Sequence, residues 1–418
     1  MLINGEYQLA LTKKLSFNRL GGSAEELRAA EILRGEVEAA GGKAALEGFL
    51  MPWYTPQVQR VQITAPSQRE IAATAIGFSG STPEEGIEAP LLYAEQGAPC
   101  DLHEASGKIV LLNEAVYDNW PRLVDSGALG YLIAAGDYDE EDARTDLAMN
   151  YLRPHQLRHG KLPGLTIRAR DAIALLQDGA KRVRITLLQD EFERVSHNVV
   201  AEIPGTNRAE EVVVFTAHYD SVPYSCGAWD NASGSADLMA LYIWFAAHPP
   251  RRTLRFVWCG SEERGLLGSK AYVKAHESEL SAYRFCINID MTGPALGYDR
   301  AIVTADPALV SQLEYQAREL GQALYVIQDV YSSDSTPFAD AGVPAVSFHR
   351  MGRAAGHSRR DLASPLSASA FARTQNLMRA FADRMINASE FPIPREIPQN
   401  MKDGIDKYYR RTASPDHK

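Results

Sequence analysis

Acidic and histidine side chains recur where apolar, strand-like runs in the second half of the chain end. His218 follows the run EVVVFTA, Asp290 ends FCINID, and His357 comes shortly after VPAVSF. The full set is His218, Asp220, Asp230, Glu262, Glu263, Asp290 and His357. Open α/β sheets bind ligands beyond the carboxyl ends of their strands, so we expect these side chains to converge. Imidazole and carboxylate groups together suit Zn²⁺ or a similar divalent ion.

The spacing within this set indicates different tasks for its members. In His218-Tyr219-Asp220, the imidazole can bind metal through one nitrogen while the carboxylate orients it from the other. The adjacent Glu262 and Glu263 point in different directions, so one can bind metal while the other faces an activated water. Asp230 follows a turn, where its carboxylate can bridge two ions. Two imidazoles and three carboxylates, one of them shared, predict a two-metal hydrolase site with ions about 3.5–4 Å apart.

The elements that must position these residues alternate between strand and helix. The runs EVVVFTA, TLRFVWCG, FCINID and VPAVSF are typical of buried strands. Helical patterns cover residues 232–247, 265–277 and 306–320, and an amphipathic helix is predicted at 367–387. This alternation predicts an α/β fold with a mixed, mostly parallel central sheet flanked by helices.

The first half predicts a helix, two strands and then a change of pattern. Ser23 and Glu26 form a capping box for a helix over residues 23–40, and strand-like KAALEGF and VQRVQIT follow. From about residue 67, short apolar runs such as GKIVLL and GYLIAA are separated by turn residues. We predict a discontinuous main domain at 1–66 and 194–395, a small strand-rich insert at 67–193, and a C-terminal tail at 396–418. The segment EFPIPREIPQ, where this tail begins, contains too many prolines for a helix.

Composition excludes several classes of function. The 418 residues include 43 Lys plus Arg against 53 Asp plus Glu, a net charge of -10, so a basic surface for nucleic acid or anionic lipid is not expected. The start MLINGEYQLALTKKLSF lacks the apolar core of a secretory signal, and no run is long enough for a membrane span, so we expect a cytoplasmic protein. Cys100, Cys226, Cys259 and Cys286 form no CxxC pair, which indicates free thiols.

These motifs resemble the co-catalytic zinc exopeptidase family that includes bacterial leucyl aminopeptidases and yeast aminopeptidase Y. The blocks that carry the resemblance are HNVVAEIPGT, AHYDS, GAWDNASG, GSEERGLLGSKAYV, NIDM, SDSTPFADAGVPAVSF and GHSRRD, in the family's order. The opening SFNRLGGSAEELRAAEIL resembles the family's first helix, so the resemblance covers most of the chain. It implies a zinc exopeptidase-like fold in which residues 67–193 form a protease-associated-like domain.

Carried over to this sequence, the resemblance implies two Zn²⁺ ions, with Co²⁺ or Mn²⁺ as alternatives. The implied ligands are His218, Asp230 and Asp290 for one ion and Asp230, Glu263 and His357 for the other. Glu262 matches the general base, Asp220 lies behind the first histidine, and the Asp230–Asn231 peptide matches a bond that is cis in the family. The implied function is a metalloprotease of the aminopeptidase type, which hydrolyses the N-terminal bond of peptides through a di-zinc-activated water.

Two departures from the family pattern affect the substrate. Ser335 stands in SDSTPF where many relatives carry a histidine, and Arg359-Arg360 follow the second histidine ligand where relatives often have smaller or uncharged residues. Side-chain preference is therefore not inherited with the motif. A carboxypeptidase or acidic-substrate dipeptidase, with Arg353, Arg359 or Arg360 gripping a carboxylate, stays open as an alternative.

Alternatives from other classes fit less well. A non-catalytic binding protein, as in the transferrin-receptor branch, has degraded metal ligands, whereas all five are present here. A glutaminyl-cyclase-like transferase would need only one zinc. The sequence contains no GxSxG elbow, P-loop or dinucleotide fingerprint. The expected partner is a peptide substrate, with no nucleic acid and no membrane, and a homo-oligomer is left open.

Overall fold

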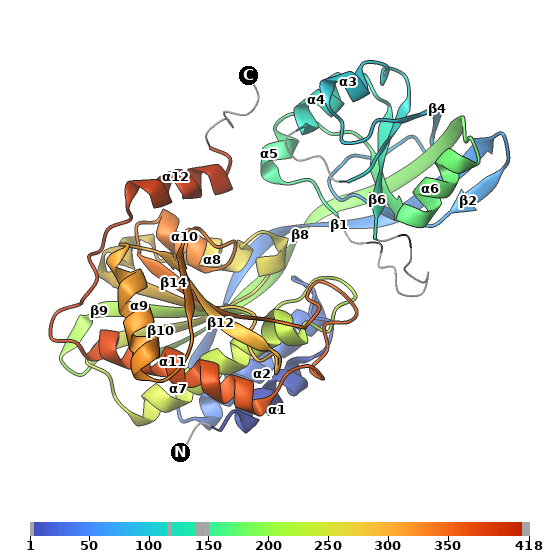
Figure 1. Ribbon diagram of the computed structural model, residues 1–418. Coiled ribbons are helices and arrows are strands. Elements are labelled where there is room, and N and C mark those ends of the chain that lie inside the picture. The colour runs from blue at the N-terminus through green and yellow to red at the C-terminus, as the bar shows by residue number, and fades with distance from the viewer. Residues whose placement is uncertain (1–3, 115–118, 137, 139–146, 148–149, 412–418) are drawn as a thin grey trace. The chain divides into compact units, whose positions relative to one another are not determined.

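The computed structural model describes residues 4–114, 119–136, 138, 147 and 150–411. The chain forms two compact units, with Met1–Met51 and Arg194–Lys418 in unit 1 and Pro52–Glu193 in unit 2 (Figure 1). All the predicted site residues belong to unit 1.

Unit 1 is built on a mixed sheet. Its strands are β8 (Arg182–Ile203), β9 (Arg208–His218), β10 (Arg252–Cys259), β11 (Tyr283–Ile289), β12 (Gly297–Thr304), β13 (Tyr325–Gln328) and β14 (Ala345–Gly352). They lie in the order β13-β12-β14-β11-β9-β10-β8. The pairs β9–β10, β9–β11, β11–β14 and β12–β13 are parallel, whereas β8–β10 and β12–β14 are antiparallel. The predicted mostly parallel sheet is confirmed.

Helices cover both faces of this sheet (Figure 1). One face carries α1 (Glu6–Leu15), α2 (Ala24–Ala39), α7 (Gly234–Ala247), α9 (Ala308–Glu319) and α11 (Ala368–Asn387). The other carries α8 (Leu267–Ala275), the 3-10 turn η3 (Glu277–Ala282) and α10 (Ser335–Asp340). The strand side chains alternate between the two cores: Phe215 and Phe256 stack at 4.9 Å in the first, while Val214 and Val257 pack in the second. Burial on both faces explains why the strands are continuous apolar runs.

The helices predicted in the second half are confirmed as α7, α8, α9 and α11. The predicted N-cap Ser23 precedes α2, where its hydroxyl accepts the N–H of Glu26. The sequence predicted neither α1 nor α10, and near the C-terminus it predicted a tail where the structure has a further helix. Directly after Pro398, α12 (Gln399–Tyr408) begins, and its Met401 and Ile405 pack with Ala339 and Ile397. The prolines stop before the helix starts, so they set its beginning without interrupting it.

The strand ends that carry the predicted ligands lie at one edge of the sheet. Cys259 of β10 is opposite His218 of β9, and Asn288 of β11 is opposite Thr216. The three parallel strands β9, β10 and β11 therefore end close to one another at this edge of the sheet. Two short turns present the remaining acidic residues there, the π-helical turn η1 (Ala228–Ser233) before α7 and the 3-10 turn η2 (Glu262–Arg264) after β10.

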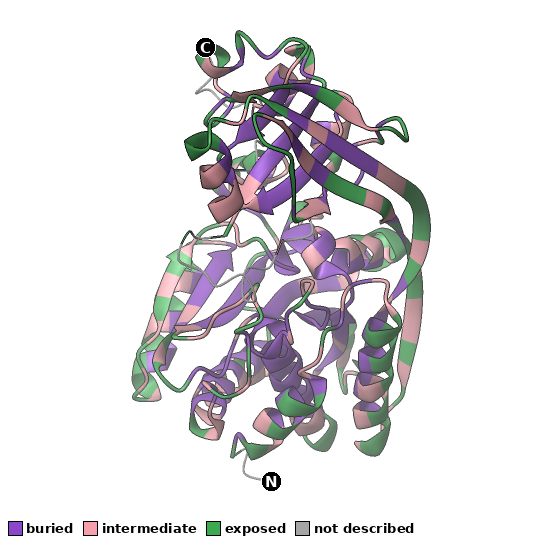
Figure 2. Ribbon diagram, turned by 90° about the vertical axis from the view of Figure 1, so that its right-hand side faces the viewer, coloured by how far each residue is buried: buried purple, intermediate pink, exposed green. Residues whose placement is uncertain are grey.

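Unit 2 has a core of its own. Its strands are β2 (Arg69–Ile71), β3 (Ala73–Ala75), β4 (Ile87–Tyr93), β5 (Ile109–Leu112), β6 (Gly130–Ala135) and β7 (Gly164–Arg168). Its helices are α3 (Pro99–Leu102), α4 (Trp120–Asp125), α5 (Pro154–Leu157) and α6 (Ala169–Gln177). Strands β4 to β7 pair in parallel, and Trp120, Tyr131 and Leu165 are buried among them. Figure 2 shows that much of the sheet in unit 2 is buried.

Two long strands connect the units. β1 (Ala44–Ala65) and β8 pair with each other and pass from one unit into the other. The predicted change of pattern near residue 67 coincides with the end of β1, whereas the contacts divide the chain inside this strand, after Met51. Among the described helices, none is both long and apolar enough to cross a membrane.

Candidate metal centre

Asp230 lies at the centre of the converging side chains. Its Oδ1 is 3.1 Å from His218 Nε2, and its Oδ2 is 3.0 Å from His357 Nε2. Asp290 Oδ1 lies 3.5 Å from His218 Nε2, and Glu263 Oε2 lies 3.1 Å from His357 Nε2. The five predicted ligands thus form two groups, each of one imidazole and one carboxylate, that share Asp230.

Glu262 reaches the same space from the side of His218. Its Oε2 is 4.0 Å from His218 Nε2, which is longer than the four distances between imidazole and carboxylate atoms given above. Ligand atoms of His218, Glu262 and Asp290 lie within 4.8 Å of one another, as do those of His218, Asp230 and Glu263. Proximity alone therefore does not separate a ligand from a base at Glu262, and the distinction rests on the resemblance.

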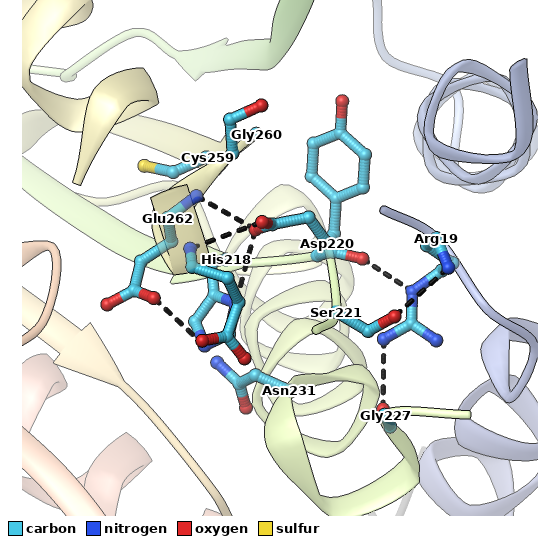
Figure 3. Close-up of polar contacts among 12 residues, drawn as sticks. Arg19, His218, Asp220, Ser221, Gly227, Asn231, Cys259, Gly260 and Glu262 are labelled. Carbon is cyan, nitrogen blue, oxygen red and sulfur yellow. Dashed lines mark hydrogen bonds and ion pairs between the residues drawn. The ribbon is translucent and has the colours of Figure 1, made fainter. Parts of the chain in front are cut away.

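Asp220 supports both the histidine and the turn that carries the glutamates (Figure 3). Its Oδ1 lies 3.4 Å from His218 Nδ1, on the side of the ring where the spacing predicted an orienting carboxylate. The same carboxylate accepts the backbone N–H of Glu262 at 2.9 Å and that of Glu263 at 3.2 Å. This second role, which was not predicted, fixes the backbone on which both glutamates stand.

The turn that presents Asp230 is held by side chains on either side of it. The Asp230–Asn231 peptide is cis, as the resemblance implied. Asn231 donates from Nδ2 to the Ile289 carbonyl at 3.0 Å, and its Oδ1 accepts the N–H of Met291 at 2.9 Å. Asn231 thereby ties the turn to the end of β11, beside Asp290.

Asp361 also fixes Asp230. Its carboxylate accepts the backbone N–H of Trp229 at 2.7 Å and that of Asp230 at 3.1 Å. The sequence marked this residue only as a carboxylate near His357. A buried carboxylate that binds two successive N–H groups restrains the backbone from the side opposite Asn231.

Arg19 is a functional candidate that sequence reasoning missed. It is fully buried and donates to the carbonyls of Tyr219, Cys226 and Gly227 at 2.5, 2.6 and 2.9 Å (Figure 3). Burial lowers the pKa of Arg19 to about 10, against the opposing effect of Asp220 and Asp361, so it remains a cation at neutral pH. It fixes the segment between Asp220 and Asp230, and a single arginine in an unaligned sequence gives no signal of this role.

The electrostatics of the cluster fit a cation. Burial, together with neighbouring carboxylates, raises the pKa of Glu262 well above its ordinary value and that of Glu263 to about 7. Burial lowers the pKa of His218, but the carboxylates around it more than offset this and hold the pKa well above its ordinary value. Hydrogen bonds to Asp230 and Glu263 raise the pKa of His357 to about 11. The raised pKa values of Glu262 and Glu263 have the direction expected of buried carboxylates with too little neighbouring positive charge.

Buried oxygens beside the cluster support the same conclusion. Asp290 Oδ1 and both carboxylate oxygens of Asp334 are buried and accept no hydrogen bond within the part of the chain that the structure describes, although His218 Nε2 lies 3.5 Å from Asp290 Oδ1. Burial raises the pKa of Asp334 to about 7. Buried acceptors of this kind are costly unless a cation or proton compensates them. The imidazole nitrogens and carboxylate oxygens of the five proposed ligands fit Zn²⁺.

The residues that depart from the family pattern lie beside this cluster. Ser335 Oγ is 2.8 Å from Ser347 Oγ, in a buried polar ladder that continues through Asn288 to Thr216. Ser335 therefore supports the strands below the metal ligands. The Arg359 guanidinium lies over the Tyr224 ring at 5.2 Å, so this arginine has an aromatic partner.

Comparison with known proteins identifies the main domain. Residues 198–382 match the model of peptidase family M28. This match lies within unit 1 and covers the part of the chain that carries the site. Its range begins in β8 and ends in α11, so it includes all five proposed ligands together with Asp220 and Glu262.

Some relatives of this chain are named aminopeptidases and others carboxypeptidases. Aminopeptidase YwaD of Bacillus subtilis is 27% identical over 344 residues, which cover 79% of this chain and 71% of the relative. Carboxypeptidase Q of Bos taurus is 27% identical over 380 residues, which cover 82% and 76%. Identity alone does not choose between the two activities.

Solved structures share the fold over nearly the whole chain. The zinc aminopeptidase BSAP from Bacillus subtilis superimposes with a TM-score of 0.78 at 23% identity, over 96% of this chain and 100% of that one. An aminopeptidase from Aneurinibacillus sp. strain AM-1 gives a TM-score of 0.75 at 22% identity, over 94% and 96%. The chain therefore shares the fold of these zinc aminopeptidases.

Proposed function

We propose that this protein is a zinc-dependent aminopeptidase of the M28 family that removes the N-terminal residue of peptides. The observation that carries the proposal is Asp230, whose two oxygens lie 3.1 and 3.0 Å from two different imidazoles. A carboxylate shared in this way suits two neighbouring ions, the arrangement that two-metal hydrolases use.

In this proposal, the two groups of side chains hold two ions. The ligands are His218, Asp230 and Asp290 for one ion and Asp230, Glu263 and His357 for the other. When bound, zinc supplies Lewis acidity to the scissile carbonyl and lowers the pKa of water. Asp220 keeps the His218 ring in its binding orientation.

Glu262 is proposed as the general base. Its carboxylate takes the proton from the attacking water and returns it to the leaving amine, as acid–base catalysis by one group requires. Its place beside the ligand cluster supports this role, because Oε2 lies 4.0 Å from His218 Nε2 and the main chain at Glu262 is held by Asp220. The base is thus near the reacting atoms while its backbone is fixed.

Attack at the amino end is favoured by two observations. YwaD and BSAP are both named aminopeptidases, and the latter resembles this chain over nearly its full length. The Arg359 side chain, a candidate for gripping a terminal carboxylate, lies against Tyr224. Carboxypeptidase activity is the second candidate, supported by the similarity to carboxypeptidase Q. A cytoplasmic location and a protease-associated-like unit 2 stay predictions.

A peptide panel tests the proposed end specificity. Zinc-loaded protein is incubated with one peptide sequence in three forms, with both ends free, with the amine acetylated, and with the carboxylate amidated. We expect cleavage of the free and amidated forms and release of the first residue. Cleavage of the free and acetylated forms alone would establish a carboxypeptidase, and no cleavage of any form would contradict both.

A further inference from the structure

The turn that carries the two site glutamates starts in an unfavourable backbone conformation. Ser261, directly before Glu262, has φ 54 and therefore lies in the left-handed region. For a residue with a Cβ this conformation is sterically unfavourable, so surrounding contacts must maintain it. Asp220 holds the N–H groups of Glu262 and Glu263, but it does not bind that of Ser261.

The N–H of Ser261 is bound by Glu26, which lies 235 positions earlier in the chain. Glu26 Oε1 accepts this N–H at 2.9 Å, the Ser261 hydroxyl at 3.0 Å and the Ser196 hydroxyl at 2.9 Å. The side chain is buried, with 1% of its surface exposed. Three successive backbone N–H groups, from Ser261 to Glu263, are thus accepted by two buried carboxylates.

Glu26 does little of the helix capping that its sequence position predicts. Ser23 Oγ accepts the Glu26 N–H at 3.1 Å, which is the expected half of a capping box. The other half is altered, because Glu26 Oε2 accepts the N–H of Gly22 at 2.7 Å. Oε1 is directed away from the helix end and serves the turn at Ser261.

Glycines on both sides of this contact let the two chain segments approach closely. A Cβ on Gly260 would lie 2.4 Å from the His197 carbonyl oxygen and 2.9 Å from Glu26 Oε1. A Cβ on Gly21 would lie 2.5 Å from Ser261 Oγ. The two glycines allow the start of α2 and the end of β10 to approach closely enough for the carboxylate to bridge them.

We propose that Glu26 is a positioning residue for the proposed reaction, which holds the left-handed turn at Ser261 and thereby aims Glu262 and Glu263. The inference rests on the proposed function for its effect on catalysis. The contact itself acts in the metal-free chain. Removing it frees the turn and misplaces the general base and one ligand together.

The test compares Glu26→Gln with two controls on the same helix. Glu25→Gln makes the same substitution at the exposed neighbouring position, and Ser23→Ala removes the helix cap without touching the turn. Hydrogen exchange of a peptide spanning residues 259–266 is measured in metal-free protein, and kcat and KM are measured with zinc bound. We expect faster exchange and a kcat lower by about 10- to 100-fold in Glu26→Gln alone, because small misplacements of catalytic groups are costly. KM should change little.

Two outcomes would overturn the inference. One is wild-type exchange and kcat in Glu26→Gln. The other is an equal loss in Ser23→Ala, which would mean that helix stability alone is responsible. Should Glu26→Gln fail to fold, Ser261→Ala removes only the hydroxyl contact, and unchanged exchange there would count against the inference. If wild-type protein lacks peptidase activity, the proposed function fails, while the exchange data still decide whether Glu26 holds the turn.

Discussion

Asp230 offers one oxygen to each of two imidazoles, and this division organises the residues around it. His218 and Asp290 face one oxygen, while His357 and Glu263 face the other. Behind three of these ligands lie further carboxylates: Asp220 lies beside His218 and binds the N–H of Glu263, and Asp361 binds the N–H of Asp230. Buried carboxylates bound to backbone N–H groups support these ligands, and such charge-assisted hydrogen bonds are among the stronger ones in proteins.

Adjacent glutamates with different roles give a sharp residue-level prediction. Glu262→Gln keeps the shape of the side chain but removes its basicity, so we expect kcat to fall by about 10²- to 10⁴-fold while both zinc ions stay bound. Glu263→Gln should instead reduce the zinc content towards one ion per chain. Metal analysis of the purified variants and steady-state kinetics measure both effects. Zinc loss in Glu262→Gln with full binding in Glu263→Gln would reverse the two assignments.

The site residues differ in how far the sequence could predict them. The ligand positions could be predicted, because each follows an apolar strand run and the motif spacing is local. Arg19, Glu26 and Asp361 could not be assigned their roles, since their partners lie about 130 to 235 positions away. Their contacts exist only once the strand ends meet, and a single sequence does not show which distant residues meet.

At the scale of elements, close approach between η1, α7 and β11 sets the position of Asp230. Gly234 is the first residue of α7, and its N–H donates to Asn231 Oδ1 at 2.9 Å. A Cβ there would lie 2.3 Å from Asn231 Oδ1 and 2.5 Å from the Ile289 carbonyl oxygen. The helix start therefore fits only a residue without a side chain.

A matched pair of glycine substitutions tests this packing. We expect Gly234→Ala to destabilise the protein by about 1–3 kcal/mol, since overpacking forces neighbours to shift, and to weaken zinc binding through Asn231. Gly35, exposed within α2, meets nothing within 4 Å, so Gly35→Ala should stabilise by about 0.5–1 kcal/mol. Chemical denaturation and zinc titration measure the two variants. Equal stabilities would show that the close approach at Gly234 is unimportant.

Elements with strong local signals were predicted, and those set by tertiary contacts were not. The capping box located α2, and continuous apolar runs located β9, β10 and β11. The sequence did not predict that KAALEGF and VQRVQIT belong to the one continuous strand β1, because pairing with β8 carries the strand through Pro52 and Pro56. The helix α12 was missed because its apolar face is short and its packing partners lie elsewhere in the chain.

At the scale of the whole molecule, the buried acidic groups of the metal centre make the free energy of unfolding depend on pH. In the metal-free chain, burial raises the pKa of Glu263 and Asp334 to about 7 each, far above their ordinary values near 4.5 and 3.8. Hydrogen bonds to Asp230 and Glu263 raise the pKa of His357 to about 11. Between pH 5 and 8 the folded state therefore binds more protons than the unfolded state, and its stability must fall as pH rises.

Thermal denaturation tests this linkage. We expect the Tm of chelator-treated protein to fall from pH 5 to pH 8, because deprotonation leaves uncompensated charge in the cluster. Zinc competes with those protons, so the Tm difference between zinc-loaded and metal-free protein should widen over the same interval. Asp334→Asn, which removes one of the raised groups, should flatten the metal-free curve. A metal-free Tm that is constant or rises over this interval would contradict the account of the site.

The central claim is that two zinc ions at the shared Asp230 enable this protein to cleave the first bond of a peptide. The most direct measurement is the initial rate of hydrolysis of a free-amine, C-terminally amidated peptide as zinc is added to metal-free protein. We expect the rate to rise up to about two equivalents of zinc per chain, as a two-metal site requires, and to disappear with a chelator. A rate independent of zinc, or a plateau at one equivalent with only one ion bound, would contradict the claim.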